Sequence, residues 1–240
     1  PELASQQRSQ EWKYHGGNIS KLDGCIYAIP QSATHVLKID PKTDTCSLFG
    51  PSLPGRWKWY GGLIGKNDGA VYGVPQKAGA VLRIHPTDGV TLHGSYGDEG
   101  YKWHGAAVAG DDEGTIVCVP SNADTVLCIK SPHVNEAKDE NTPDNEERKV
   151  PEPILYEVGD DDLIQTGRHR NDKKYKYLGA MAGADGSVYI FPSGSEYVLQ
   201  VDPQTNKIQN VGPNLYDSGL SDICQNKWQN GVCAGKFVYG

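Results

Sequence analysis

Three side chains that could bind a ligand or transfer protons occupy the same place in a repeated motif. The motif is an aromatic residue, a lysine, a second aromatic residue, a variable residue and then glycine. In successive copies the variable residue is His15, Tyr60, His104, Leu178 and Gln229. Imidazole and phenol groups serve as general acids and bases, and imidazole also ligates metals. His15, Tyr60 and His104 are therefore the candidate binding residues.

No other group of residues has the spacing of a known catalytic or metal site. Two histidines without a carboxylate at ligand spacing are a weak metal signal, so we expect no metal and no cofactor. The sequence has no nucleophile elbow, HExxH pair, phosphate-binding loop or dinucleotide fingerprint, and we assign no catalytic residue. Asp160, Asp161 and Asp162 are adjacent, so their side chains would not converge on a cation, and we predict a solvated turn.

A lysine recurs beside the candidate residues in every copy of the motif. The five are Lys13, Lys58, Lys102, Lys176 and Lys227. They could form a ring of cations for an anionic ligand. Alternatively, each could pair with a carboxylate or lay its stem over an aromatic ring. We favour the second interpretation, because residues that recur in every copy serve the fold and a site must break the symmetry.

The rest of each copy predicts four short strands that would position these side chains. In the first copy an inner strand follows the glycine pair, and the turn Asp23-Gly24 opens a hairpin into a strand that ends at Pro30. A third strand covers 36–39 and a weaker fourth one 46–49. Four strands in about 45 residues are typical of a β-propeller blade. No helical pattern separates the strands, which excludes a parallel α/β fold.

The predicted fold is therefore all-β: a β-propeller of four-stranded antiparallel blades, with four full repeats and a partial fifth. A β-sandwich is the alternative, but it would have no reason to repeat its motifs. We predict an N-terminal arm at 1–10, blades at about 11–55, 56–99, 100–172 and 173–224, and a partial blade at 225–240. Blade three contains an acidic insertion at 131–153, for which we predict a surface loop.

The motifs resemble those of known propeller repeats. The glycine pair resembles kelch repeats, although in kelch the pair precedes the Tyr and Trp. Asp-Gly-x-Val-Tyr followed by Val-x-x-Ile-Asp-Pro resembles streptogramin-lyase and NHL-type blades. The form [WY]-K-[WY]-x-G-[GA] is similar to repeats that are abundant in algal and protist proteins. This resemblance implies the fold and leaves the activity open, because propellers host enzymes and scaffolds alike.

Composition excludes several classes of function. Lys plus Arg total 23 and Asp plus Glu 30, a net charge of −7, so we expect no nucleic-acid partner. No apolar run approaches the roughly 18 residues of a membrane helix, so we expect no membrane span. The six cysteines do not occupy matching repeat positions. We expect them to be reduced, which favours a reducing compartment; Cys118 and Cys128 could be cross-strand neighbours.

Two further expectations concern the edges between blades. The recurring Tyr27, Tyr72 and Tyr189 should be buried between successive blades. The fifth copy stops after two strands, so Phe237, Val238 and Tyr239 would present an open strand edge. We expect further sequence of the same protein, or a strand added by a partner, to cover that edge.

These observations favour a non-enzymatic propeller that binds other protein chains, for example as an accessory subunit of a larger assembly. The partner surfaces would be the propeller faces, the 131–153 loop or the open edge near 237–239. One alternative is a lyase, lactonase or hydrolase working at the mouth of the central channel, with His15, Tyr60 or His104 as proton-transfer groups. A lectin-like protein whose exposed aromatic residues stack on sugars is the other alternative.

Overall fold

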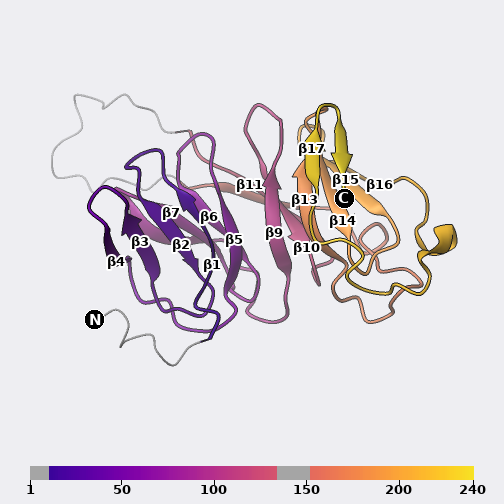
Figure 1. Ribbon diagram of the computed structural model, residues 1–240, viewed down its shortest axis with the longest axis horizontal. Helices are drawn as coiled ribbons and strands as arrows, with labels where there is room; N and C mark the ends of the chain where they lie inside the picture. The colour runs from indigo at the N-terminus through magenta and orange to yellow at the C-terminus, as the bar shows by residue number, and fades with distance from the viewer. Residues whose placement is uncertain (1–10, 134–151) are drawn as a thin grey trace.

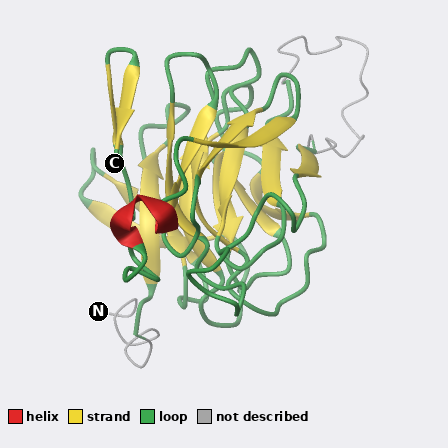
Figure 2. Ribbon diagram, turned by 90° about the vertical axis from the view of Figure 1, so that its right-hand side faces the viewer, coloured by secondary structure: helices red, strands yellow, loops and turns green. Residues whose placement is uncertain are grey.

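The computed structural model describes residues 11–133 and 152–240, which form four antiparallel sheets of four strands each. Blade 1 contains β1 (Tyr14–Ile19), β2 (Ile26–Pro30), β3 (Val36–Asp40) and β4 (Thr45–Phe49); blade 2 contains β5 (Trp59–Ile64), β6 (Val71–Pro75), β7 (Val81–His85) and β8 (Gly89–His93); blade 3 contains β9 (Trp103–Val108), β10 (Ile116–Pro120), β11 (Val126–Lys130) and β12 (Ile154–Val158); blade 4 contains β13 (Tyr177–Ala182), β14 (Val188–Pro192), β15 (Val198–Asp202) and β16 (Lys207–Val211). Strands and loops make up nearly all of the described chain, apart from one short helical segment (Figure 2).

The blades follow one another in chain order, and their first strands lie side by side. In every blade the order of the strands in the sheet is their order in the sequence. β5 neighbours β1 and β9, and β9 also neighbours β13. Figure 1 shows the blades spread along the long axis of the molecule, with the N-terminal blade at one end and the C-terminus near the other. The all-β propeller class predicted from the repeats is confirmed.

The inner strand of each blade begins before the Gly-Gly or Gly-Ala pair of the motif, so the predicted start after the pair is wrong. β1 already begins at Tyr14, and its register against β2 shifts between Tyr14 and Gly17. Gly16 has φ +78°, a left-handed conformation that side chains disfavour. The first glycine thus forms a β-bulge that bends the strand, and the ladder continues across the pair.

A polar triad, which the sequence analysis missed, holds the Asp-Gly turn before the second strand in blades 1, 2 and 4, and it is fully buried in blade 2. Asp68 accepts hydrogen bonds from the hydroxyl of Tyr72 at 2.7 Å and from Nε of Arg83 at 2.9 Å. The side chains of Asp68 and Arg83 are fully buried. Blade 1 repeats the arrangement with Asp23, Tyr27 and Lys38, and blade 4 with Asp185, Tyr189 and Gln200.

The hydrophobic core consists of three clusters, each packed between two consecutive blades. Tyr27 lies in the first cluster and Tyr72 in the next, and both are fully buried, as predicted. Tyr189 is only half-buried, so the prediction is wrong there. The reason is that the described chain places a two-stranded hairpin beside blade 4 rather than a full blade.

The fifth copy forms the short strands β17 (Val232–Ala234) and β18 (Phe237–Tyr239). A short helical segment, η1 (Tyr216–Leu220), lies between β16 and this hairpin, and it is kinked at Ser218 and Gly219. Among the described residues β18 pairs only with β17. Phe237 and Tyr239 are each 55% exposed. The predicted open strand edge is therefore present in the part of the chain that the structure describes, and what covers it stays a prediction.

All six cysteines are free thiols, and Cys118 and Cys128 lie on paired strands without facing each other. Cys128 pairs with Val117, so Cys118 is displaced by one residue and points to the other side of the sheet. The two thiols accordingly belong to different core clusters. Within 11–133 and 152–240, no helix is long and apolar enough to cross a membrane. The predicted arm at 1–10 and residues 134–151 of the acidic insertion lie outside the described residues.

Candidate functional site

The three predicted site residues come together as one stack of rings. His15, Tyr60 and His104 occupy equivalent positions in β1, β5 and β9. The ring centroids of His15 and Tyr60 are 3.6 Å apart with an interplanar angle of 26°. Tyr60 and His104 are also 3.6 Å apart, at 28°. The stack forms because neighbouring inner strands each place this residue directly before the glycine bulge.

The stack lines a cavity of about 380 Å³, which we call the inner cavity. The same motif position contributes Leu178 from β13 and Gln229 from the fifth copy to its wall. The rest of the wall consists of Leu63, Asn230 and the glycine and alanine residues that follow the motif. No Asp, Glu, Lys or Arg among the described residues lines the inner cavity.

The titratable groups of the stack are uncharged at neutral pH. Burial lowers the pKa of His15 and of His104, and it raises the pKa of Tyr60. Each shift favours the neutral form of the side chain. The inner cavity is thus a site of neutral hydrogen-bonding groups and glycine backbone.

Hydrogen bonding fixes which groups of the stack are available to a ligand. Nδ1 of His104 lies 3.2 Å from the carbonyl oxygen of Leu178. A carbonyl only accepts, so Nδ1 donates, and Nε2 of the neutral ring is left as an acceptor. Nδ1 of His15 is buried and has no hydrogen-bond partner among the described residues. Both faces of the Tyr60 ring are covered by imidazoles, so the tyrosine offers its edge and hydroxyl.

The stack does not have the geometry of a metal site. Tyr60 lies between His15 and His104 and holds the two imidazoles apart. Zinc ligands, by contrast, converge to within about 2.0–2.1 Å of a single ion. The described residues contain no group of three or more His, Cys, Asp or Glu side chains placed to hold a metal.

Two of the recurring lysines, Lys58 and Lys176, bind backbone carbonyls across the joints between blades. The ammonium of Lys58, a residue only 5% exposed, donates to the carbonyls of Ala33 at 2.8 Å, Gly55 at 3.0 Å and Gln31 at 3.3 Å. Burial lowers the pKa of Lys58 to about 8, which leaves the ammonium dominant at neutral pH. Ala33 and Gln31 belong to the preceding blade, so the lysine joins two blades.

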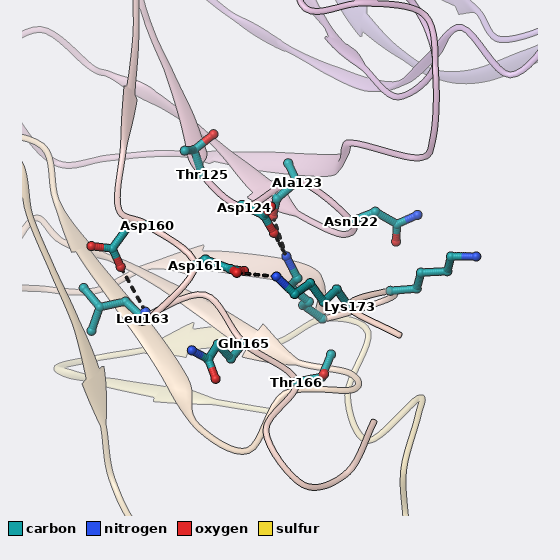
Figure 3. Close-up of polar contacts among 12 residues, drawn as sticks. Asn122, Ala123, Asp124, Thr125, Asp160, Asp161, Leu163, Gln165, Thr166 and Lys173 are labelled. Carbon is teal, nitrogen blue, oxygen red and sulfur yellow. Dashed lines mark hydrogen bonds and ion pairs between the residues drawn. The ribbon is translucent and has the colours of Figure 1, made fainter. Parts of the chain in front are cut away.

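Lys176 joins blades 3 and 4 in the same way. Its buried ammonium donates to the carbonyl of Ala123 at 3.0 Å and to Asp124 at 2.6 Å. Asp161 lies nearby and pairs with Lys173 (Figure 3). Of the two interpretations of the lysines, carboxylate pairing is right for Lys176. For Lys58, Lys102 and Lys227 the hydrogen-bond partners are backbone carbonyls. The ammonium of Lys58 also lies 5.7 Å from the ring centroid of Trp59, so the aromatic part of that interpretation is right for Lys58.

The acidic triplet forms the predicted turn. A carboxylate oxygen of Asp160 accepts the backbone N–H groups of Asp162 at 3.0 Å and Leu163 at 3.2 Å. Figure 3 shows Asp160 and Asp161 pointing to different partners. The triplet therefore shapes the loop between blades 3 and 4.

The sequence matches no protein-family model and no curated protein. Solved structures do resemble the fold. Virginiamycin B lyase from Staphylococcus aureus is 14% identical, with a TM-score of 0.57 over 85% of this chain and 57% of that one. A catalytically inactive histidine-to-alanine variant of that lyase, with quinupristin, is 12% identical and has a TM-score of 0.58. The match covers 96% of this chain and 63% of that one. Hydrazine synthase from Kuenenia stuttgartiensis is 13% identical and has a TM-score of 0.51. The match covers 83% of this chain and 49% of that one.

These likenesses establish the fold and leave the activity open. All three identities are below 15%, and the three structures include two different enzymes. The chain spans about 57–63% of the length of the lyase structures that it matches. The β-propeller fold is shared, while the kelch-like resemblance gains no support.

Proposed function

We propose that this protein is a non-catalytic β-propeller module that binds another protein chain, and that the inner cavity receives an uncharged polar segment of that partner. The observation that carries the proposal is the neutrality of the inner cavity. Its side chains are two neutral imidazoles, a phenol, the amides of Gln229 and Asn230, and leucines. This set offers hydrogen bonds and no charge.

A neutral polar segment suits this wall better than an ion does. A buried charge needs an opposite charge or several hydrogen bonds to offset its lost hydration, whereas a peptide amide needs only one or two partners. Nε2 of His104 accepts, the Tyr60 hydroxyl donates, and the Gln229 amide does both. Rigid propeller faces present such groups in fixed positions, which lowers the ordering cost of binding.

Photo-cross-linking tests this binding function. A photo-reactive residue replaces Leu178, which lines the inner cavity but lies outside the ring stack. The matched control places the same group at Ser47, an exposed residue of the outer strand β4. We expect specific chains from the native source to be captured at position 178 and not at 47. Identical capture at both positions, or none at 178, would exclude the inner cavity as the binding site.

A lyase-type enzyme is the second candidate, and one observation favours it. The hydrogen bond of Nδ1 leaves Nε2 of His104 as a proton acceptor, and His104 lines the inner cavity. The similar virginiamycin B lyase loses its activity in a histidine-to-alanine variant. Incubation with quinupristin, followed by mass spectrometry, separates the candidates. We expect no conversion; conversion that disappears in a His104→Ala variant would replace the binding function with an enzymatic one.

Two further surfaces belong to the proposal. The open edge of β18, with the exposed Phe237 and Tyr239, suits the addition of a strand from a partner or from further sequence of the same protein. The acidic loop at 131–153 is the other, and its residues 134–151 lie outside the described residues.

A further inference from the structure

A second cavity of about 190 Å³, which we call the side cavity, adjoins the inner cavity and shares His104 and Leu178 with it. The rest of its wall consists of Gln76, Tyr101, Ser121, Tyr175, Gln225 and Asn226. We propose that the side cavity binds one uncharged sugar ring, a neutral hexose that is either free or the end of a glycan. The inference goes beyond the proposed function, because it concerns a different ligand and residues that do not line the inner cavity.

The side cavity forms where blades 2, 3 and 4 meet at one end of their sheets. Gln76 and Ser121 directly follow the prolines that end β6 and β10. Tyr101 and Tyr175 stand just before the strands β9 and β13. Because the first two strands of a blade are antiparallel, the residues before one and after the other lie at the same end of the sheet. The fold thus gathers polar side chains from different blades around one cavity.

Two oxygens in this wall lack the hydrogen bonds that buried polar atoms need. Oε1 of Gln76 and Oγ of Ser121 are buried and have no hydrogen-bond partner among the described residues. Gln76 is only 4% exposed and Ser121 only 1%. Their backbone carbonyls are already engaged, since they accept the N–H groups of Lys102 at 2.9 Å and Lys176 at 2.8 Å. A buried polar group without a partner destabilises a fold, so two in one cavity indicate that a bound molecule supplies the missing hydrogen bonds.

A change of residue at one repeat position makes room for that molecule. The residue after the strand-ending proline is Gln31 in blade 1, Gln76 in blade 2 and Ser121 in blade 3. Gln31 has the same buried, unpartnered oxygen as Gln76, but it is not part of the wall of the side cavity. The blade after Gln31 supplies a second glutamine, whereas the blade after Gln76 supplies the much shorter serine. The missing side-chain length leaves space next to Gln76.

The wall of the side cavity carries no charge. No Asp, Glu, Lys or Arg among the described residues lines it. Burial lowers the pKa of His104, which keeps that imidazole neutral. A charged ligand would lose its hydration without gaining an opposite charge, so the wall disfavours it. The ligand must therefore donate hydrogen bonds without carrying a charge, as hydroxyl groups do.

Several hydroxyls on one compact ring match the hydrogen-bonding groups of the wall. Oε1 of Gln76 only accepts, whereas Gln225 uses its own Oε1 to accept from Arg170 and offers its NH2 group as a donor. Sugar hydroxyls donate and accept, so neighbouring hydroxyls on one ring satisfy both kinds of group. A peptide unit carries a single N–H and a single C=O, which cannot serve Gln76, Ser121 and Gln225 together in so small a volume.

Two tyrosines supply the aromatic surface that the C–H groups of a sugar ring pack against. Asn122 fixes the backbone of both: its N–H donates to the carbonyl of Tyr101 at 3.0 Å, and its Oδ1 accepts the N–H of Tyr175 at 2.9 Å. Lys77 lies 5.0 Å from the ring centroid of Tyr101, and Arg170 lies 5.4 Å from that of Tyr175. Neither cation is part of the wall, so each holds its ring in place without charging the cavity. Rings fixed in advance lower the ordering cost of binding.

Saturation-transfer NMR on the full chain tests the proposal. The probes are the free hexoses glucose, galactose and mannose and the neutral disaccharides maltose, lactose and mannobiose. We expect at least one of them to receive saturation at its ring hydrogens. Tighter binding of a disaccharide would identify a glycan end as the ligand, and equal binding would identify the free sugar. Glucuronate and glucosamine carry a charge on the same ring and should bind at least tenfold more weakly. No transfer to any neutral probe, or equal binding of the charged ones, would overturn the proposal.

A matched pair of variants locates the binding. Gln76→Leu removes the unpartnered oxygen from the wall, and Gln31→Leu makes the same change outside the wall. We expect Gln76→Leu to weaken sugar binding at least tenfold and Gln31→Leu to leave it unchanged. Neither variant should lower the urea midpoint, because each replaces a buried unpartnered group with an apolar one. Equal sugar affinity in the two variants, or a lower urea midpoint for Gln76→Leu alone, would count against the site.

A third variant fills the side cavity. Ser121→Gln restores the long side chain that blades 1 and 2 have at this position, and Ser47→Gln on the exposed strand β4 is its control. We expect Ser121→Gln to abolish sugar binding and Ser47→Gln to retain it; binding retained by Ser121→Gln would overturn the proposal. Because Gln76 and Ser121 do not line the inner cavity, their variants should still capture the protein chains of the proposed function. The two readouts therefore show separately whether the sugar site or the protein-binding function fails.

Discussion

The buried Lys58 at the first blade joint should contribute measurably to stability. Its counterpart Lys13, whose ammonium has no hydrogen bond or ion pair among the described residues, should not. Lys58→Met keeps the length and apolar stem of the side chain and removes the ammonium that binds three carbonyls. Lys13→Met makes the same change at the equivalent position in blade 1. The pair of variants therefore isolates the contacts of the ammonium.

The structure sets the expected magnitude. Without the ammonium, Gln31 keeps the backbone N–H of Lys58 as a donor, and the exposed Gly55 turns to water. The carbonyl of the fully buried Ala33 loses this donor. A buried unsatisfied carbonyl costs about 1–3 kcal/mol, and relief from burying a charge offsets part of the loss. We expect Lys58→Met to lower the free energy of unfolding by about 1–3 kcal/mol.

Urea unfolding followed by circular dichroism measures both variants. In a chain of this size each kcal/mol corresponds to roughly 2–4 °C in melting temperature, which provides a second readout. Lys13→Met should change the free energy of unfolding by less than about 0.5 kcal/mol, as ordinary surface substitutions do. Equal losses in the two variants, or no loss for Lys58→Met, would refute the role of the lysine at the joint.

Three further predictions follow from burial. Tyr72→Ala should lower the free energy of unfolding by about 3–5 kcal/mol, and Tyr189→Ala by less, because Tyr72 is fully buried and Tyr189 only partly so. Because burial holds the pKa of His15 and His104 below 6.5, the unfolded chain binds more protons between the folded pKa and 6.5. The free energy of unfolding should therefore fall as the pH drops through that window. Urea titrations at several pH values should show a smaller fall for the His104→Gln variant. A thiol reagent should modify only the exposed cysteines Cys46, Cys224 and Cys233 before unfolding, and modification of Cys25, Cys118 or Cys128 in the folded chain would contradict the core.

Much of the fold could be predicted because recurring turn and proline residues mark where strands begin and end in each repeat. The turn Asp23-Gly24 and the terminal Pro30 mark both ends of β2. The same marks recur in blades 2 and 4, and blade 3 has Glu113-Gly114 in place of the Asp-Gly turn. The predicted start of the inner strands was wrong. A glycine pair usually indicates the end of a strand, whereas here it forms a β-bulge within the strand. Only the positive φ of the first glycine distinguishes the two cases.

The candidate site could be predicted in position but not in geometry. Equivalent repeat positions brought His15, Tyr60 and His104 together, whereas their stacking depends on the bend at each bulge. The carbonyl partners of Lys58 left no sequence signal, because any residue supplies a carbonyl. The Asp–Tyr triads did leave one, since their spacings of 4 and 15 residues recur at Asp23, Asp68 and Asp185.

Placing a charge in the inner cavity tests the binding function most directly. Leu178→Asp puts a carboxylate into its neutral wall, and Leu92→Asp puts the same group on the exposed outer strand β8. Chains that the unmodified protein captures from its native source are quantified by mass spectrometry for both folded variants. We predict that Leu178→Asp loses the captured chains and that Leu92→Asp retains them. Full retention by Leu178→Asp would contradict a neutral partner-binding cavity.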